Sequence, residues 1–159
     1  MIVKLVSGGQ TGVDCGALDA ALEIGLPCGG WCPKGRRSED GRIPGKYPLA
    51  ETASSGYGER TQRNVLDSDA TLILARGTLT GGSALTRKLA IKAGRPCLVV
   101  NPEDVGKALV DVDRWLRANP GIRVLNLAGP RESTDPGIGE FAHAFMLGAL
   151  ARFSDVLSR

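Results

Sequence analysis

The sequence of 159 residues is short of aromatic residues and contains no apolar run approaching the length of a membrane span. Aromatic residues make up 4% of the chain, so few rings are present to stack on the bases of a single-stranded nucleic acid. The N-terminus lacks a cationic leader and a small-residue cleavage site, and its apolar run covers only residues 2–6. We therefore expect neither export nor a membrane span, and we predict a cytoplasmic protein.

Histidine and paired cysteines are also scarce. Of the four cysteines, only Cys28 and Cys32 are close in sequence, and no second pair completes a zinc-binding set. Cys15 and Cys97 are expected to be small packing residues in a reducing compartment. The single histidine, His143, lies between two alanines in a predicted helix, and we interpret it as an ordinary helix residue rather than a base. We predict no metal ligand.

Charge of one sign does not dominate the chain. The 20 basic and 17 acidic residues give a net charge of +3, which favours acidic small ligands only weakly and makes a nucleic-acid partner unexpected. No metalloprotease, kinase or serine-hydrolase motif is present, and the acids near the glycine-rich loops described below have no partner fixed by spacing. We therefore predict no catalytic residue and favour a binding protein over an enzyme.

The chain does contain a regular alternation of short apolar runs and helical segments, with 42% hydrophobic residues. This alternation is typical of a mainly parallel α/β sheet, and the length suits one domain over residues 1–159. The apolar runs predict about five strands, near residues 2–6, 27–32, 70–75, 96–101 and 122–128.

Boundary signals mark three of the helices. The first ends at Gly25, and a later one begins with Asn101 as its cap and Pro102 in the first helical position. The last begins after Pro136 and carries an aromatic stripe, which we interpret as core or, alternatively, as a subunit interface. The faces expected to be buried are Val13, Ala17, Leu18, Ala21 and Leu22, then Val105, Leu109, Val112 and Leu116, then Phe141, Phe145, Ala149 and Phe153.

The most informative segment is a glycine-rich loop, residues 7–14, directly after the first predicted strand. Its three glycines allow the backbone to approach a ligand closely, and Thr11 and Asp14 have the spacing of a capping box. The start of a helix offers unpaired N–H groups and a partial positive charge, so phosphate is the expected ligand. The alternative is a tight strand-to-helix turn that binds nothing.

A second glycine-rich loop, residues 76–83, follows the predicted strand 70–75 and leads into the next helix. Ser83 is a candidate cap, and Thr78 and Thr80 can donate hydrogen bonds to phosphate or carbonyl oxygens. Because ligands of parallel sheets bind beyond the carboxyl ends of the strands, we expect the two loops to form one site. Two unrelated turns are the alternative.

Two further segments carry polar groups suited to a phosphate or a heterocycle. Arg60 and Asn64 lie one turn apart in a predicted helix, where a solvated helix face is the alternative. Residues 126–135 include the end of the fifth predicted strand, with Arg131 and Ser133 as candidate anion contacts, or they form a plain proline-rich turn.

One loop, residues 33–58, is longer than ordinary connections between elements. It has no helical or alternating period, so we expect either an ordered basic lid over the site or a solvated loop. Its basic residues are Lys34, Arg36, Arg37, Arg42 and Lys46.

In this order, the motifs resemble the molybdenum cofactor carrier family over nearly the whole chain. The same order also resembles a wider Rossmann-like superfamily, which includes the cytokinin-activating nucleotide hydrolases and the DNA-processing protein DprA. The resemblance implies a doubly wound, three-layer α/β/α fold. It rests on Ser7-Gly8-Gly9-Gln10-Thr11-Gly12-Val13-Asp14, Gly30-Trp31, Pro33, Gly35-Arg36, Glu39-Asp40-Gly41, Ile43-Pro44, Arg60-Thr61, Asn64-Val65, Gly81-Gly82-Ser83 and Ala128-Gly129-Pro130-Arg131.

The resemblance implies a homo-oligomer, a dimer or tetramer, that holds and protects molybdenum cofactor (molybdopterin) as cargo and has molybdoenzyme apo-proteins as partners. The metal would be held by the cofactor's own dithiolene sulfurs, so no protein ligand is required. The loops and the resemblance together predict the following cofactor-binding residues: Ser7, Gly8, Gly9, Gln10, Thr11, Gly12, Lys34, Arg36, Arg60, Asn64, Gly77, Thr78, Thr80, Gly81, Gly82, Ser83 and Arg131.

Two alternative functions follow from the wider superfamily. The first is binding or hydrolysis of a nucleotide or an ADP-ribose derivative. The hydrolysing relatives carry a glutamate at the end of their glycine loop, and residues 77–85 lack one here, which argues against hydrolysis. The second is DprA-like binding of single-stranded DNA, which the small number of aromatic residues disfavours.

Overall fold

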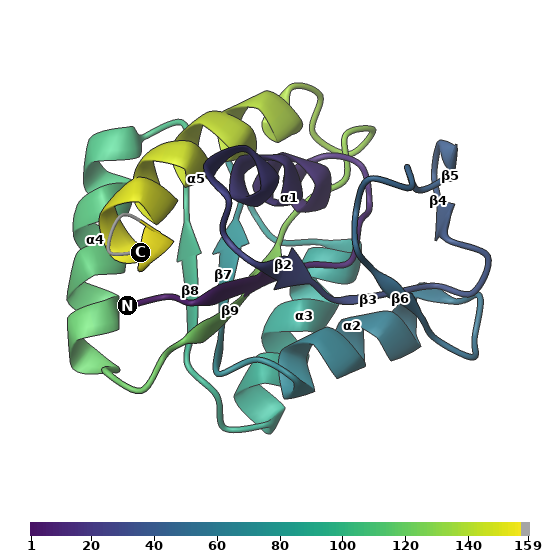
Figure 1. Cartoon of the computed structure of the whole chain (residues 1–159), viewed down its shortest axis with the longest axis horizontal. Helices are drawn as coiled ribbons and strands as arrows, with labels where there is room; N and C mark the ends of the chain where they lie inside the picture. Colours follow the sequence, from purple (N-terminus) through teal and green to yellow (C-terminus); the bar gives the residue numbers. More distant parts are fainter. Residues whose placement is uncertain (157–159) are drawn as a thin grey trace.

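The computed structural model describes residues 1–156 and contains a central sheet of five strands, all parallel. The strand order is β2-β1-β9-β7-β8 (Figure 1). The predicted fold class, a mainly parallel α/β sheet of about five strands, is confirmed; the boundaries of the single domain stay a prediction, and residues 157–159 lie outside the described part. The strands are β1 (Lys4–Val6), β2 (Cys28–Gly29), β7 (Ala70–Leu74), β8 (Cys97–Val100) and β9 (Val124–Ala128).

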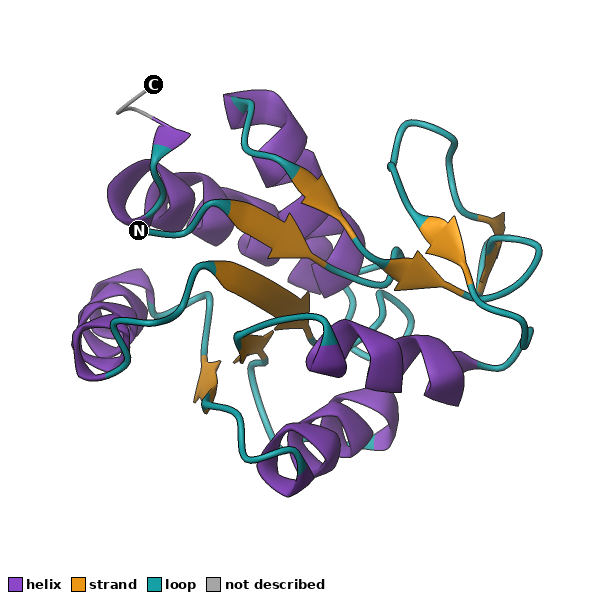
Figure 2. Ribbon diagram, turned by 60° about the horizontal axis from the view of Figure 1, so that its bottom comes forward, coloured by secondary structure: helices purple, strands orange, loops and turns teal. Residues whose placement is uncertain are grey.

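Helices cover both faces of this sheet. The helices α1 and α5 lie together on one face with α4 beside them, and α2 and α3 cover the other face, giving three layers (Figures 1 and 2). None of the helices within residues 1–156 has the length and apolar content needed to cross a membrane. The helices are α1 (Val13–Ile24), α2 (Tyr57–Leu66), α3 (Gly81–Lys92), α4 (Val105–Ala118) and α5 (Ile138–Phe153).

The core lies between the sheet and the pair α1 and α5. The two helices approach closely at Gly16, where a Cβ would lie 2.5 Å from the Gly139 carbonyl oxygen. The aromatic stripe of α5 packs into this core through Phe145 and Phe153, which confirms the core interpretation for them, whereas Phe141 is only half-buried and lies under the Arg76 guanidinium. The predicted burial of Leu22 and Val105 is wrong, since they are 41% and 47% exposed. The predicted homo-oligomer stays a prediction.

The chain adds strands toward opposite edges of the sheet on the two sides of β1 and β9. The chain moves from β1 to β2 on one side and from β7 to β8 on the other, and β9 returns between β1 and β7. This arrangement places the carboxyl ends of β1, β9 and β7 side by side. In open parallel sheets such a reversal leaves a crevice in which ligands bind.

The predicted strand 27–32 is two strands in different sheets. It breaks at Gly30, whose φ of +132° turns the chain and whose Cβ, if present, would lie 2.2 Å from the Ser7 carbonyl oxygen. The following residues form β3 (Trp31–Cys32), which pairs in parallel with β6 (Ala50–Glu51). The long loop also contains an antiparallel hairpin, β4 (Arg37–Ser38) and β5 (Gly41–Arg42).

The predicted end of the first helix at Gly25 is confirmed, but the three predicted N-terminal caps are wrong. The helix α4 begins after a turn in which Asn101 Oδ1 accepts a hydrogen bond from Glu103 N–H, so Asn101 and Pro102 precede it. The helix α3 begins at Gly81, which puts Ser83 inside its first turn. The N-cap of α1 is Gly12, so the predicted capping box of Thr11 and Asp14 does not form. Both side chains have partners elsewhere, as described below.

Candidate functional site

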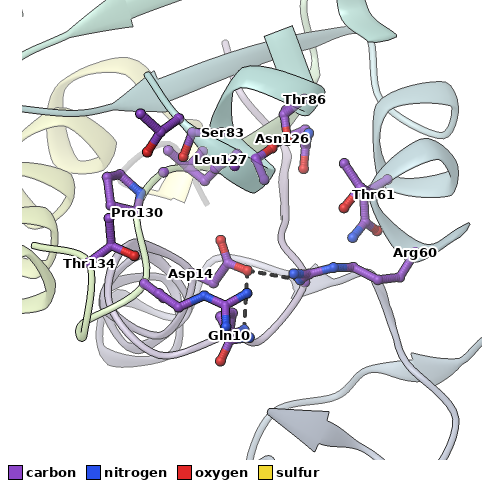
Figure 3. A pocket seen from close by; sticks show the side chains of 18 of the residues that line it. Gln10, Asp14, Arg60, Thr61, Ser83, Thr86, Asn126, Leu127, Pro130 and Thr134 are labelled. Atoms are coloured by element: carbon purple, nitrogen blue, oxygen red, sulfur yellow. Dashed lines mark hydrogen bonds and ion pairs between the residues drawn. The ribbon is translucent and has the colours of Figure 1, made fainter. Parts of the chain in front are cut away.

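A cavity of about 420 Å³ opens where the carboxyl ends of β1, β7 and β9 meet (Figure 3). Four segments line it: Gly8 and Gln10 after β1, residues 80–83 after β7, residues 126–131 at the end of β9, and the α2 face that carries Arg60. The predicted meeting of the two glycine loops therefore occurs, with α2 closing one side. The volume is within the usual range for a small-molecule site.

The second glycine loop presents free backbone donors to this cavity. Gly81 and Gly82 are exposed, and a Cβ at either would meet no atom within 4 Å. Within residues 1–156, the N–H groups of Gly81, Gly82 and Ser83 have no acceptor, since the first bond of the helix runs from Ala84 N–H to Thr80 O at 3.3 Å. Three unpaired N–H groups at a helix start are suited to bind an anion.

The glycines of the first loop are packed against other parts of the protein, whereas the prediction placed them against a ligand. Gly8, Gly9 and Gly12 are all buried, and protein atoms occupy the space that a side chain at each of them would take. A Cβ at Gly8 would lie 1.7 Å from Arg60 Nη1, and one at Gly12 would lie 2.4 Å from the Pro130 carbonyl oxygen. These close approaches bring Arg60 and the loop after β9 against β1.

Three amides of the first loop are engaged within the protein. Gln10 N–H donates to Asp14 Oδ2 at 3.1 Å, and Thr11 N–H donates to Gln10 Oε1 at 3.0 Å. Val13 N–H donates to the Pro130 carbonyl oxygen at 3.2 Å. Within residues 1–156 the N–H groups of Gly8, Gly9 and Gly12 have no acceptor either, but these three glycines are buried whereas Gly81 and Gly82 are exposed, so the second loop is the more accessible anion site.

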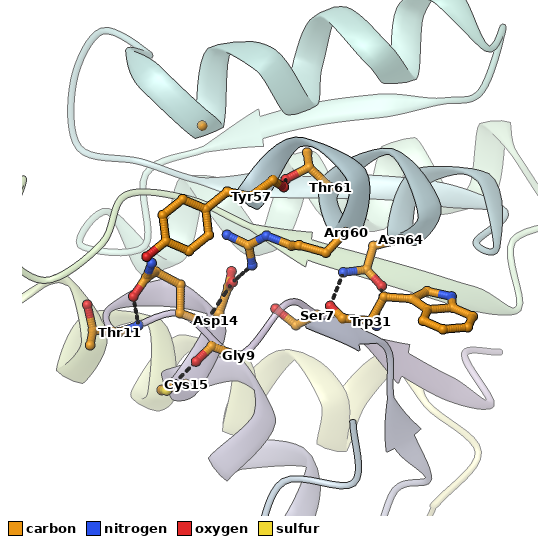
Figure 4. A network of polar contacts seen from close by, with 12 residues as sticks. Ser7, Gly9, Thr11, Asp14, Cys15, Trp31, Tyr57, Arg60, Thr61 and Asn64 are labelled. Atoms are coloured by element: carbon orange, nitrogen blue, oxygen red, sulfur yellow. Dashed lines mark hydrogen bonds and ion pairs between the residues drawn. The ribbon is translucent and has the colours of Figure 1, made fainter. Parts of the chain in front are cut away.

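A buried ion pair joins α2 to the first loop. Arg60 Nη1 lies 3.1 Å from Asp14 Oδ2, with the two side chains 12% and 9% exposed (Figures 3 and 4). Burial raises the pKa of the Asp14 carboxyl above its ordinary value, and the Arg60 charge opposes this shift. The pair orients the guanidinium beside the cavity, where a fixed positive charge can stabilise an anionic ligand.

Two buried donors beside the cavity have no acceptor in the described part of the chain. They are Gln10 Nε2 and Arg60 Nε. The Gln10 amide orientation is fixed because its Oε1 accepts from both Thr11 N–H and Glu39 N–H. Buried polar groups are rarely left unpaired, so an acceptor from outside the chain, either a water oxygen or an atom of a ligand, would complete these two donors.

Tyr57, the first residue of α2, is surrounded by guanidinium groups. The Cζ atoms of Arg37, Arg60 and Arg131 lie 4.9, 5.4 and 5.2 Å from the centre of its ring. Arg60 and Arg131 also line the cavity. The ring therefore holds positive charges together at the cavity wall through cation–π contacts.

Asn64 lines the cavity, but its amide is already engaged. Its Oδ1 accepts from Trp31 N–H at 2.7 Å, and its Nδ2 donates to the Trp31 carbonyl oxygen at 3.0 Å (Figure 4). Asn126, on β9, donates through Nδ2 to Thr71 Oγ1 at 3.2 Å. Asn64 therefore holds β3 against α2 and has little capacity left for a heterocycle.

The comparison with protein families matches residues 5–150 to the family described as "Circularly permutated YpsA SLOG family". The chain belongs to this family. A solved structure from Syntrophus aciditrophicus SB, of a protein named "putative molybdenum carrier protein", is 45% identical and has a TM-score of 0.88. The similarity covers 93% of this chain and 94% of that chain. None of the curated proteins matches the sequence. The predicted resemblance to molybdenum carriers within a Rossmann-like superfamily is confirmed.

In this SLOG protein, about half of the predicted site residues line the cavity. Those that do are Gly8, Gln10, Arg60, Asn64, Thr80, Gly81, Gly82, Ser83 and Arg131. The lining of this cavity does not include Ser7, Gly9, Thr11, Gly12, Lys34, Arg36, Gly77 or Thr78.

Several residues outside the lining have structural contacts. Ser7 Oγ donates to the Leu127 carbonyl oxygen, which ties β1 to β9. Arg36 donates from Nη2 to the carbonyl oxygens of Pro44 and Tyr47, so it organises the long loop from within. Thr78 lines a separate cavity of about 390 Å³ on the outer side of α3.

Ten lining residues of the SLOG chain were not among the predicted cofactor-binding residues: Asp14, Thr61, Thr86, Asn126, Leu127, Ala128, Gly129, Pro130, Ser133 and Thr134. Asp14 was assigned only to a cap, although its partner Arg60 was predicted. Thr61 follows Arg60 directly, and its Oγ1 donates to the Tyr57 carbonyl oxygen. Thr86 is one helical turn after Gly82, and its Oγ1 donates to the Gly82 carbonyl oxygen at 2.8 Å. The helical spacing from predicted residues was the available signal for Thr61 and Thr86.

The cysteines and the histidine lie outside this cavity. The four cysteines are free, and burial raises the pKa of the Cys15 thiol to about 11. Within residues 1–156 no group of three or more histidine, cysteine or acidic side chains is placed to hold a metal ion. His143 Nε2 lies 2.8 Å from Glu23 Oε2 at the surface.

Proposed function

We propose that the chain binds molybdenum cofactor in this cavity and acts as its carrier. The observation that carries the proposal is the convergence of three unpaired N–H groups of α3 and two guanidiniums, those of Arg60 and Arg131, on one cavity. This donor set suits the phosphate of a small ligand. The name of the structure from Syntrophus aciditrophicus SB supports the choice of molybdenum cofactor over other phosphate-bearing molecules.

The other donors of the cavity suit the heterocycle of such a ligand. A pterin has a carbonyl oxygen and ring nitrogens that accept hydrogen bonds, and Gln10 Nε2 and Arg60 Nε are buried donors that need acceptors. The metal remains on the dithiolene sulfurs of the cofactor, so it is cargo and needs no protein ligand. The chain's role is to bind, orient and shield the ligand.

The proposal is tested by anaerobic titration with molybdenum cofactor, followed by transfer to an apo-molybdoenzyme. We expect retention at micromolar concentration and recovery of activity when the apo-enzyme is added. Absence of retention would contradict the carrier function. If nucleotides or ADP-ribose derivatives instead raise the melting temperature in a ligand panel, the cavity serves a nucleotide.

Substituting Gly82 is expected to block ligand binding without harming the fold. Gly82 lines the cavity and has open space at its Cβ position, so Gly82→Val puts a branched side chain beside the anion-binding amides. We expect the affinity for molybdenum cofactor to fall at least about tenfold, which corresponds to about 1.4 kcal/mol. Binding is measured by the same titration, and folding by thermal unfolding.

Gly106→Val is the matched control for this variant. Gly106 is the second residue of α4, as Gly82 is the second residue of α3, and a Cβ there also meets no atom within 4 Å. It is absent from the lining of the cavity. We expect wild-type affinity in Gly106→Val, and equal affinity in both variants would place the ligand elsewhere.

A further inference from the structure

The Glu39 carboxylate lies in a ring of hydrogen-bond donors at the rim of the cavity. The hydroxyl groups of Thr11 and Ser133 both donate to it. Ser133 N–H donates to Glu39 Oε1 at 3.2 Å, and Arg131 Nη1 lies 3.8 Å from Glu39 Oε2. These contacts hold the pKa of the Glu39 carboxyl below its ordinary value, the Ser133 hydroxyl contributing most. The carboxylate is therefore bound as an anion.

The same donors suit an oxyanion from outside the protein. Two hydroxyls, a backbone N–H and a guanidinium are the groups with which proteins bind phosphate. Arg131 and Ser133 also line the cavity. Glu39 is therefore a carboxylate of the protein itself that occupies Arg131 and Ser133, two donors that an anionic ligand in the cavity could also reach.

The segment that carries Glu39 is joined to the rest of the molecule through side chains, which include the buried Ser38 of β4 and Arg37, whose Nη1 donates to the Ser55 carbonyl oxygen. Glu39 lies in the turn between β4 and β5, two-residue strands that pair with each other and not with the central sheet (Figure 2). Besides the side-chain contacts, Glu39 N–H donates to Gln10 Oε1 at 3.0 Å. Ile43, just after β5, is buried and anchors the base of the hairpin. Because β4 and β5 pair only with each other in the described sheets, opening of the turn would have to break the Glu39 contacts but no pairing with the central sheet.

We propose that Glu39 is a displaceable latch, which an anionic group of the ligand replaces on Arg131 and Ser133 so that the β4–β5 turn opens. The inference rests on the proposed function, because it takes the cavity to be an anion site. It further indicates a ligand with two anionic positions, one at the start of α3 and one at the latch. Binding then has to break the Glu39 contacts, so the latched state weakens the apparent affinity.

Inorganic pyrophosphate is the probe for this latch, with Glu39→Gln as the variant. The glutamine keeps the size of the side chain and loses its charge, so it competes poorly for the donors. We expect the affinity of Glu39→Gln for pyrophosphate, measured by calorimetry, to exceed that of the wild type by about tenfold. Asp40→Asn makes the same charge change in the same turn and is expected to bind pyrophosphate as the wild type does.

A second measurement follows the opening of the turn directly. Arg37 and Arg42 are exposed trypsin sites on either side of Glu39. We expect pyrophosphate to speed cleavage at these sites in the wild type, and Glu39→Gln to be cleaved quickly without ligand.

The outcomes separate the latch from the proposed function. If the wild type binds pyrophosphate and Gly82→Val does not, while Glu39→Gln gains no affinity, then Glu39 is a permanent tether and the latch is wrong. If Asp40→Asn gains as much affinity as Glu39→Gln, the gain reflects bulk charge and the latch is also wrong. If neither wild type nor Glu39→Gln binds pyrophosphate, the latch and the anion site both fail.

Discussion

Replacing Arg60 with alanine is expected to lower the free energy of unfolding by about 3–5 kcal/mol at neutral pH, the usual cost of leaving one partner of a buried ion pair alone. Asp14 would remain as a buried carboxylate with only the hydrogen bonds of its own loop. The same change removes a guanidinium and an unpaired donor from the cavity, so ligand binding is expected to be lost as well. Urea denaturation measures the stability.

The loss of stability in Arg60→Ala is expected to depend on pH. Burial raises the pKa of Asp14 above its ordinary value of 3.8, and removing Arg60 raises it further. A carboxyl group with a higher pKa in the folded chain destabilises the fold above its unfolded pKa, and this penalty vanishes as the pH falls below that value. The difference between wild type and variant should therefore narrow as the pH is lowered toward the ordinary pKa.

The control for this prediction is the double variant Arg60→Ala with Asp14→Asn. It removes the buried charge, so we expect it to be more stable than Arg60→Ala alone at neutral pH. If Arg60→Ala is as stable as the wild type, or if the double variant is no more stable than Arg60→Ala, the buried ion pair does not stabilise the fold in this way.

Gly12→Ala is expected to lower the free energy of unfolding by about 2–5 kcal/mol, from left-handed backbone strain and overpacking together. The φ of Gly12 is +81°, and a Cβ there would lie 2.4 Å from the Pro130 carbonyl oxygen and 2.8 Å from Glu132 N. Both neighbours are backbone atoms of the loop after β9, so that loop has to move. Thermal unfolding measures the effect.

Gly82→Ala is the comparison for this variant, and it is expected to change the free energy of unfolding in the opposite direction. Gly82 is helical and has open space at its Cβ position, so alanine is expected to stabilise the chain by about 0.5–1 kcal/mol. If Gly12→Ala is tolerated, or Gly82→Ala destabilises, the different roles assigned to the two glycine loops are wrong.

The sheet could be predicted from the sequence because its strands are continuous apolar runs, such as residues 70–74, which are buried throughout. The N-caps could not, and in the first helix this is because both side chains of the expected capping box have distant partners. Thr11 donates to Glu39, 28 residues away, and Asp14 pairs with Arg60, 46 residues away. Local spacing carries no information about such partners, and tertiary contacts outweigh a capping preference of about 1 kcal/mol.

The roles of the two glycine loops also could not be predicted from local sequence. Both were expected to lie against a ligand, since both follow a strand and precede a helix. Only the folded chain shows that Gly8 faces Arg60 and that Gly81 faces open space. The meeting of the loops could be predicted from the sheet topology, but the division between packing and binding depends on which side chains reach each loop.

The most direct test of the account is a crystal structure with molybdenum cofactor bound under anaerobic conditions. The account predicts cofactor in the cavity between α2, α3 and the loop after β9, with its phosphate within hydrogen-bond distance of the N–H groups of Gly81, Gly82 and Ser83. Cofactor bound at another surface, or with its phosphate away from these amides, would contradict it.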